Sequence, residues 1–356
     1  MRQSALFLFL AAGVLCVLCC NCRCSESGQS AQGPSSIGNE PANLTVPEPL
    51  LGASFETTAT EHFVLFHEPD AGYVAGACRT LEYAYGHFYE VFSRAGFDLS
   101  RSQDRLVWIC FPRKSAFSQY ALQVEGMDLS WLDGYYSTLT NRVAIVQADQ
   151  KARLRQEAAP EPPASDVQVV VAAHRSPREG VLPMSAAGQR FDVTRLTHEV
   201  AHQLSFNSGI QKRGVMYPLW VSEGLATNFE FDASGTAGIE RCNTARCKGL
   251  LEAYAEGDLV PLRQFVTQTT VPPDAHVGRR YYAQAWGFFQ FILTERPENL
   301  RTYLYRLAQT RPEHHDERAL LAEFTEAFGS AEALELSWNV FLASQARQAS
   351  ANRLAP

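Results

Sequence analysis

Two histidines spaced four residues apart are the residues of this sequence best suited to chemistry. His198 and His202 enclose Glu199 in the pattern His-Glu-x-x-His, within residues 192–204. On a helix, residues at positions i and i+4 lie about one turn apart on one face, so both imidazoles can reach one metal ion, and Glu199 is rotated to the side. The pentapeptide alone also fits an ordinary pair of surface histidines on an amphipathic helix.

The residues around this motif predict an amphipathic helix. Four apolar residues at helical spacing share one face, and the two histidines lie on the opposite face. The apolar residues are Val193, Leu196, Val200 and Leu204. Asn207, Ser208 and Gly209 then provide a helix stop. We therefore expect one face of the helix to pack on the core while the other presents the imidazoles.

A second helix is expected to begin near Pro218, because proline suits the first turn of a helix, and this helix carries Glu223. Glu223 lies 21 residues after His202, and the glycine-containing link between the helices is long enough for the chain to reverse and place them side by side. Two neutral imidazoles and one carboxylate leave the fourth position of a tetrahedral zinc ion open to water, which is the catalytic arrangement. The sequence thus predicts one catalytic zinc ion per chain.

These motifs resemble those of the gluzincin zinc metallopeptidases, the peptidase MA-like superfamily. His198-Glu199-x-x-His202 is followed at a suitable interval by Trp-Val-Ser-Glu223-Gly, and the likeness is strongest to bacterial exported members of unassigned substrate. Two weaker segments agree with it, residues 281–286 and residues 324–329, the latter before a helix that carries Trp338. Together they extend the resemblance over roughly residues 63–342.

The resemblance implies a role for each site residue. His198, His202 and Glu223 would be the zinc ligands, Glu199 the general base, and Tyr282 the hydrogen-bond donor to the developing oxyanion. Because Tyr281 is adjacent to Tyr282, the alternative is that both tyrosines belong to the aromatic core.

The sequence departs from two better-known branches of this superfamily. The aminopeptidase branch carries a Gly-x-Met-Glu-Asn-like segment that holds a substrate amine, and nothing equivalent precedes His198, so exopeptidase specificity is unsupported. The thermolysin branch places an aspartate four residues beyond the glutamate ligand to orient a histidine. Thr227 occupies that position here, so the sequence leaves the outer partner of the histidines unidentified.

The pattern of the remaining chain predicts an α+β fold, a thermolysin-like or gluzincin catalytic domain in which a small mixed sheet lobe precedes a mainly helical lobe. Strands are expected at residues 62–66 and 106–111, with a helix at about 72–95 between them, and residues 134–136 and 142–146 fit two strands or one long bent strand. The expected boundaries are 56–190 for the sheet lobe with a mobile insertion at 150–189, 191–346 for the helical zinc-binding lobe, and 347–356 for a C-terminal tail.

The N-terminal residues predict export. Residues 1–24 combine Arg2 with an apolar run of the length of a secretory signal, and residues 25–55 have the polar composition of a flexible linker. An uncleaved membrane anchor is the alternative, and lipidation has weak support because no cysteine within residues 1–24 follows glycine or alanine. The remaining cysteines form two pairs: Cys78 and Cys110 fit buried thiols, while Cys242 and Cys247 favour a small disulfide loop.

Net charge and composition limit the kinds of binding partner that the sequence supports. The 356 residues carry a formal net charge of −7 with no basic block, so a nucleic-acid partner is not supported. We expect an exported zinc metallopeptidase that acts on a peptide or protein substrate and touches a membrane only through an N-terminal anchor or lipid. The alternatives are a catalytically silent binding or scaffold protein of the same shape and a zinc hydrolase of a non-peptide amide.

A substrate strand is also predicted. Residues 134–146 would bind an extended substrate by main-chain hydrogen bonds, Tyr135 and Tyr136 would line a cleft, and residues 150–189 would cover it as a lid. The alternative is an interior strand pair beside a plain surface insertion.

Overall fold

The fold is taken from a computed structural model that describes residues 51, 54–147, 193–230, 244–272, 274–309 and 316–354. The expected signal segment, nearly all of the linker, the insertion at 150–189 and Cys242 lie outside the described residues. In the part that is described, none of the helices combines the length and the apolar character needed to cross a membrane.

A small mixed sheet forms the N-terminal part of the fold. Its strands are β1 (Glu56–Ala59), β2 (Phe63–His67), β3 (Leu106–Phe111), β4 (Gly134–Ser137) and β5 (Arg142–Val146). Their spatial order is β1-β2-β3-β5-β4, with parallel pairing of β3 to β2 and to β5 and antiparallel pairing at both ends. Residues 134–146 are therefore two strands joined by a turn, in which Asn141 has a φ of 55°.

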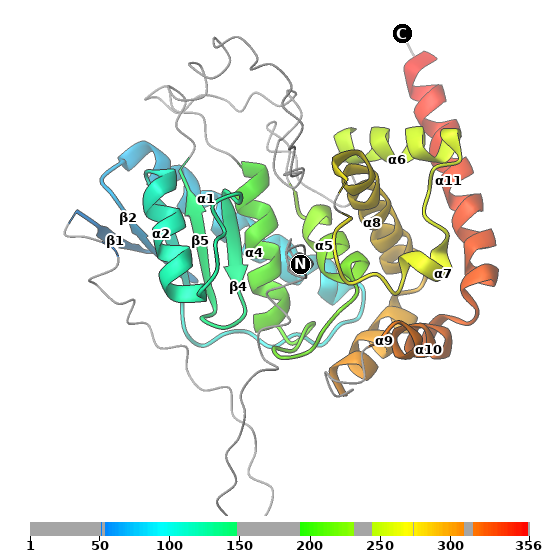
Figure 1. The fold of residues 1–356 in the computed structure, drawn as a ribbon, viewed down its shortest axis with the longest axis horizontal. Helices are drawn as coiled ribbons and strands as arrows, with labels where there is room; N and C mark the ends of the chain where they lie inside the picture. Colours follow the sequence, from blue (N-terminus) through cyan, green and yellow to red (C-terminus); the bar gives the residue numbers. More distant parts are fainter. Residues whose placement is uncertain are drawn as a thin grey trace, which may run out of the picture.

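Helices cover both faces of this sheet (Figure 1). Trp108 and Cys110 of β3 pack with α1 (Ala71–Arg94) and α4 (Val193–Asn207), whereas Val107 and Ile109 pack with α2 (Lys114–Glu125) on the other face. This alternation follows from the two-residue period of a strand, and β3 is apolar throughout because both of its faces are buried.

The second half of the fold is helical. After α4 it contains α5 (Leu219–Asn228), α6 (Thr244–Glu256), α7 (Leu262–Phe265), α8 (Ala275–Glu295), α9 (Pro297–Gln309), α10 (Glu317–Phe328) and α11 (Ala331–Leu354). The last helix continues beyond residue 346, where the helical lobe was expected to end. The observed class is α+β, with a five-stranded sheet followed by a mainly helical region, as the sequence predicted.

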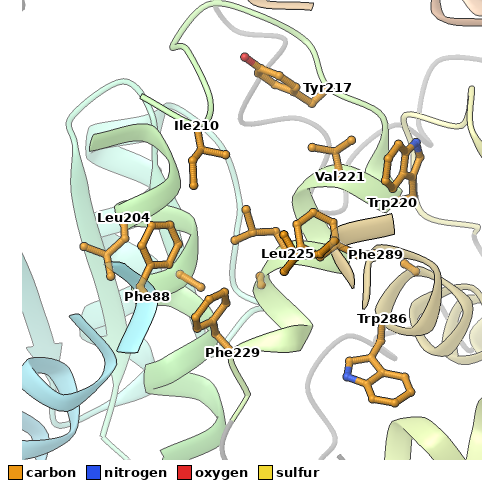
Figure 2. Packing of buried hydrophobic residues seen from close by; sticks show 14 of the residues in the cluster. Phe88, Leu204, Ile210, Tyr217, Trp220, Val221, Leu225, Phe229, Trp286 and Phe289 are labelled. Atoms are coloured by element: carbon orange, nitrogen blue, oxygen red, sulfur yellow. The ribbon is translucent and has the colours of Figure 1, made fainter. Parts of the chain in front are cut away.

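One hydrophobic core joins the sheet to the helical region (Figure 2). Phe88 of α1 lies beside Leu204 of α4 and has its ring centroid 5.1 Å from that of Phe229, at the end of α5. Leu225 of α5 then meets Phe289 of α8. Because a close-packed core resists displacement, these contacts fix α4, α5 and α8 relative to one another.

The structure tests the prediction that Cys78 and Cys110 are buried thiols. Cys110 is a buried thiol, as expected, and burial raises its pKa to about 12. Cys78 is partly buried, and it is not bonded to Cys110.

Candidate metal centre

Helix α4 presents the His-Glu-x-x-His motif as the sequence predicted. The four apolar residues of its predicted core face are all buried. Gln203 ties the same helix to the sheet, since its Oε1 accepts a hydrogen bond from Trp108 Nε1 at 2.8 Å and its Nε2 donates to the Asn141 carbonyl at 3.1 Å. The helix is thus held from its core side, and the two histidines lie on its other side.

A hydrogen-bonded turn places α5 beside α4. Gly209, with a φ of 87°, follows the end of α4, and Pro218 immediately precedes α5. Between them, Gln211 accepts a hydrogen bond from Ser205 Oγ at 2.6 Å and donates one to Ser222 Oγ at 3.0 Å. Gln211 therefore links the last turn of α4 to the first turn of α5. Its partner there, Ser222, is the residue before Glu223.

The predicted ligands converge on one point. The Nε2 atoms of His198 and His202 are 3.2 Å apart, and they lie 3.5 and 3.7 Å from Oε2 and Oε1 of Glu223 respectively. The ligand atoms of the three residues all lie within 4.8 Å of one another. Around a tetrahedral ion with bonds near 2.1 Å, neighbouring ligand atoms are roughly 3.4 Å apart. These three side chains can therefore hold a metal ion.

Burial and neighbouring carboxylates displace the pKa values of the two histidines in opposite directions. Burial alone would lower the pKa of His198, but hydrogen bonds to Glu223 and Glu230 raise it to about 10. Burial lowers the pKa of His202 to about 4. A cation bound between these residues would compete with a proton on Nε2 of His198, because the ligand nitrogen must offer a free lone pair.

Glu199 lies beside this cluster. Burial raises the pKa of its carboxyl group to about 7, with Glu223 acting in the same direction and Arg195 opposing it. The backbone of Tyr136 in β4 also opposes the rise in the pKa of Glu199. A carboxyl group whose pKa is near neutrality can both accept and return a proton at neutral pH.

The structure distinguishes Tyr282 from Tyr281. Tyr281 belongs to the core, since its hydroxyl donates to the Phe265 carbonyl at 3.2 Å and its ring packs against the Phe265 ring. Burial and Glu223 raise the pKa of both phenols well above the usual range, but only the Tyr282 hydroxyl also interacts with Glu223 through hydrogen bonding. Of the two tyrosines, Tyr282 is therefore the one adjacent to the candidate ligands.

Glu230 and Arg246 complete the site and were not identified from the sequence. His198 Nδ1 lies 3.1 Å from Glu230 Oε1, and Arg246 holds both carboxylate oxygens, with Nη2 2.8 Å from Oε1 and Nε 3.0 Å from Oε2. Burial alone would raise the pKa of Glu230, but Arg246 and His198 lower it to about 2. Thr227, at the position where the thermolysin branch has aspartate, donates to the Glu223 carbonyl of its own helix at 2.7 Å.

The predicted substrate strand has its side chains buried. Tyr135 packs on the α2 side, with its ring centroid 5.6 Å from that of Phe117, and Tyr136 packs on the α4 side near Phe206. Neither side chain is more than 4% exposed, so the expectation that they line an open cleft is not supported. What β4 brings to the site is its main chain at Tyr136, which lowers the pKa of the Glu199 carboxyl group.

A protein-family model matches the part of the chain that contains the candidate metal centre. Residues 192–314 match a family described as "Protein of unknown function (DUF1570)". The match contains all three candidate ligands together with Glu199, Glu230, Arg246 and Tyr282. A search of curated proteins finds no match.

Proposed function

We propose that this chain is an exported zinc metallopeptidase of the gluzincin type, with a thermolysin-like catalytic domain. The observation that carries the proposal is the convergence of His198, His202 and Glu223 within 4.8 Å, with a second carboxylate, Glu199, beside them. Two imidazoles and one carboxylate form a three-residue ligand set typical of catalytic zinc, which keeps one position for water or substrate. Closed structural zinc sites instead use four protein ligands, mostly cysteine and histidine.

The residues around the ligands fit hydrolysis of an amide bond. Zinc, when bound, would supply Lewis acidity and lower the pKa of water. Glu199 would accept the proton of the attacking water and pass it to the leaving amine, which its pKa of about 7 favours. The Tyr282 hydroxyl would donate to the carbonyl oxygen as negative charge develops on it. The main chain of β4, which contacts Glu199 through Tyr136, would align an extended peptide at the site.

Metal analysis tests the ligand assignment. We expect the purified wild-type chain to contain one zinc ion and the His202→Ala variant to lose it. His276→Ala is a suitable control, because His276 is an exposed residue near the start of α8 and should leave the zinc content unchanged. Equal zinc content in the wild type and His202→Ala would refute the assignment.

A peptide-library digest tests the activity. We expect cleavage by the wild type, loss of cleavage on addition of a chelator, and a decrease of about 10²- to 10⁴-fold in turnover for Glu199→Gln with zinc retained, because that substitution removes the proton acceptor at nearly constant volume. Undiminished cleavage by Glu199→Gln would show that another group activates the water. Zinc binding without cleavage of any peptide would refute peptidase activity and favour a non-peptide amide or a silent binding protein.

Export is a separate part of the proposal. It is supported by the apolar run that follows Arg2 within residues 1–24. Fractionation of cells that express the full chain should place it in the envelope or the medium, and deletion of residues 1–24 should retain it in the cytoplasm.

A further inference from the structure

Glu230 is a buried carboxylate in contact with a candidate metal ligand, although it is not a ligand itself. Its side chain is 5% exposed and lies just beyond the end of α5. Oε1 is close to both His198 Nδ1 and Arg246 Nη2, and Oε2 receives the second hydrogen bond from Arg246. A buried carboxylate is costly unless it is paired and hydrogen-bonded, and both of its oxygens are satisfied here.

This contact sets the orientation of the His198 ring. An ionised carboxylate only accepts hydrogen bonds, so Nδ1 of His198 must carry the proton that it shares with Glu230. The opposite nitrogen, Nε2, is the atom that faces Nε2 of His202 and Oε2 of Glu223. Glu230 therefore holds the ring with its ligand nitrogen directed toward the other two ligands.

Arg246 connects this carboxylate to a separate helix and to the candidate oxyanion donor. It lies on α6, and its planar guanidinium group grips Glu230 through two nitrogens, a geometry that lysine cannot reproduce. The same guanidinium carbon lies 5.5 Å from the centroid of the Tyr282 ring. Arg246 therefore contacts both Glu230 and Tyr282.

We propose that Glu230 and Arg246 are positioning residues of the metal centre, in which Arg246 fixes the Glu230 carboxylate and that carboxylate fixes His198 for metal binding. The inference rests on the proposed zinc site and extends it by two residues that bind no metal themselves. A role limited to holding α6 against the rest of the fold is the competing explanation. The two explanations differ in whether metal affinity changes separately from stability.

Competition with a chromophoric chelator measures zinc affinity in the full chain. We expect Glu230→Gln to weaken zinc binding by about 10- to 100-fold, because the amide keeps the volume and an acceptor but loses the charge that orients His198. We expect Arg246→Met to weaken it in the same direction and Arg246→Lys to restore part of the loss. Arg306→Met is the matched control, since Arg306 joins α9 to α10 by a comparable bond to Glu323 at 2.7 Å, and should leave zinc affinity unchanged.

The visible spectrum of the cobalt-substituted chain provides a second measurement, because it reports ligand geometry. A shifted spectrum for Glu230→Gln, with an unfolding midpoint of the metal-free chain close to that of the wild type, would support positioning. Zinc affinity within twofold of the wild type and an unchanged cobalt spectrum would overturn it. If Arg246→Met does not fold, the Glu230→Gln result decides alone.

Parallel peptide digests keep this inference separate from the proposed activity. Zinc affinity that depends on Glu230 in a chain that cleaves no peptide supports positioning and refutes the peptidase. Peptide cleavage by a chain whose zinc affinity is independent of Glu230 supports the peptidase and refutes positioning.

Discussion

Gly224 follows the candidate ligand Glu223 and allows α5 and α8 to approach closely. A β-carbon at Gly224 would lie 2.6 Å from the Ala285 carbonyl oxygen and 2.9 Å from Phe289 Cβ, whereas ordinary contacts begin at 3.4 Å. Gly224→Ala would therefore push the two helices apart by about 0.8 Å, enough to forfeit roughly a quarter to a half of the attraction between atoms across that contact. Overpacking of this kind typically costs about 1–3 kcal/mol.

Gly249→Ala is the matched control for that substitution. Gly249 lies within α6 and also faces α8, but its added β-carbon would meet Ala283 Cβ at 3.5 Å, an ordinary contact. Both substitutions gain about 1 kcal/mol from the higher helix propensity of alanine, so this gain cancels when the two variants are compared. Gly224→Ala should thus be less stable than Gly249→Ala by about 1–3 kcal/mol.

Denaturant unfolding followed by circular dichroism measures the difference between these variants. Chelator should be present throughout, so that metal binding does not contribute to the measured free energy of unfolding. Equal unfolding free energies for Gly224→Ala and Gly249→Ala would refute the argument, because they would show that α5 and α8 separate at no cost.

Two further predictions concern buried polar groups. Trp108→Phe should destabilise the fold by about 1–3 kcal/mol in denaturant unfolding, because it leaves the buried Gln203 Oε1 without the indole donor. Burial raises the pKa of Glu125, although a hydrogen bond from the Ser137 hydroxyl opposes the rise. The ionised carboxylate therefore destabilises the fold as the pH rises above the unfolded pKa near 4.3. Glu125→Gln should therefore be more stable than the wild type at pH 7, and this difference should disappear toward pH 4. Unfolding free energies of variant and wild type that differ by the same amount at both pH values would contradict the prediction that buried Glu125 is destabilising when ionised.

Local patterns were sufficient to predict the three side chains that converge at the candidate metal centre. His198 and His202 occupy one face of a helix whose other face is apolar, and both facts follow from helical periodicity alone. Glu223 required only that a second helix return beside the first, which the glycine and proline residues between them permit. The sheet was predictable for a similar reason, since β3 is a short apolar run and β4 and β5 are separated by a polar turn.

The outer partner of His198 could not be predicted in this way. Glu230 lies two residues beyond the end of α5, so the direction of its side chain depends on how the chain leaves the helix at Phe229. The only indication in the sequence was that Glu230 lies seven residues after Glu223, which is about two helical turns and would place both on one face of a continuous helix. Arg246 comes from a different helix, and no periodicity within α5 indicates which cation will meet Glu230.

The choice between Tyr281 and Tyr282 shows most clearly why tertiary packing was needed. Adjacent residues on a helix differ by about 100° in direction, so only one of the two can face Glu223, and the rotation of α8 about its axis decides which. That rotation depends on the contact of α8 with Gly224, where the absence of a side chain brings Ala285 of α8 against α5. The Glu-Gly pair thus combines a candidate ligand with the close approach of α8 that places Tyr282 near it. This role of Gly224 is visible only once both helices are in place.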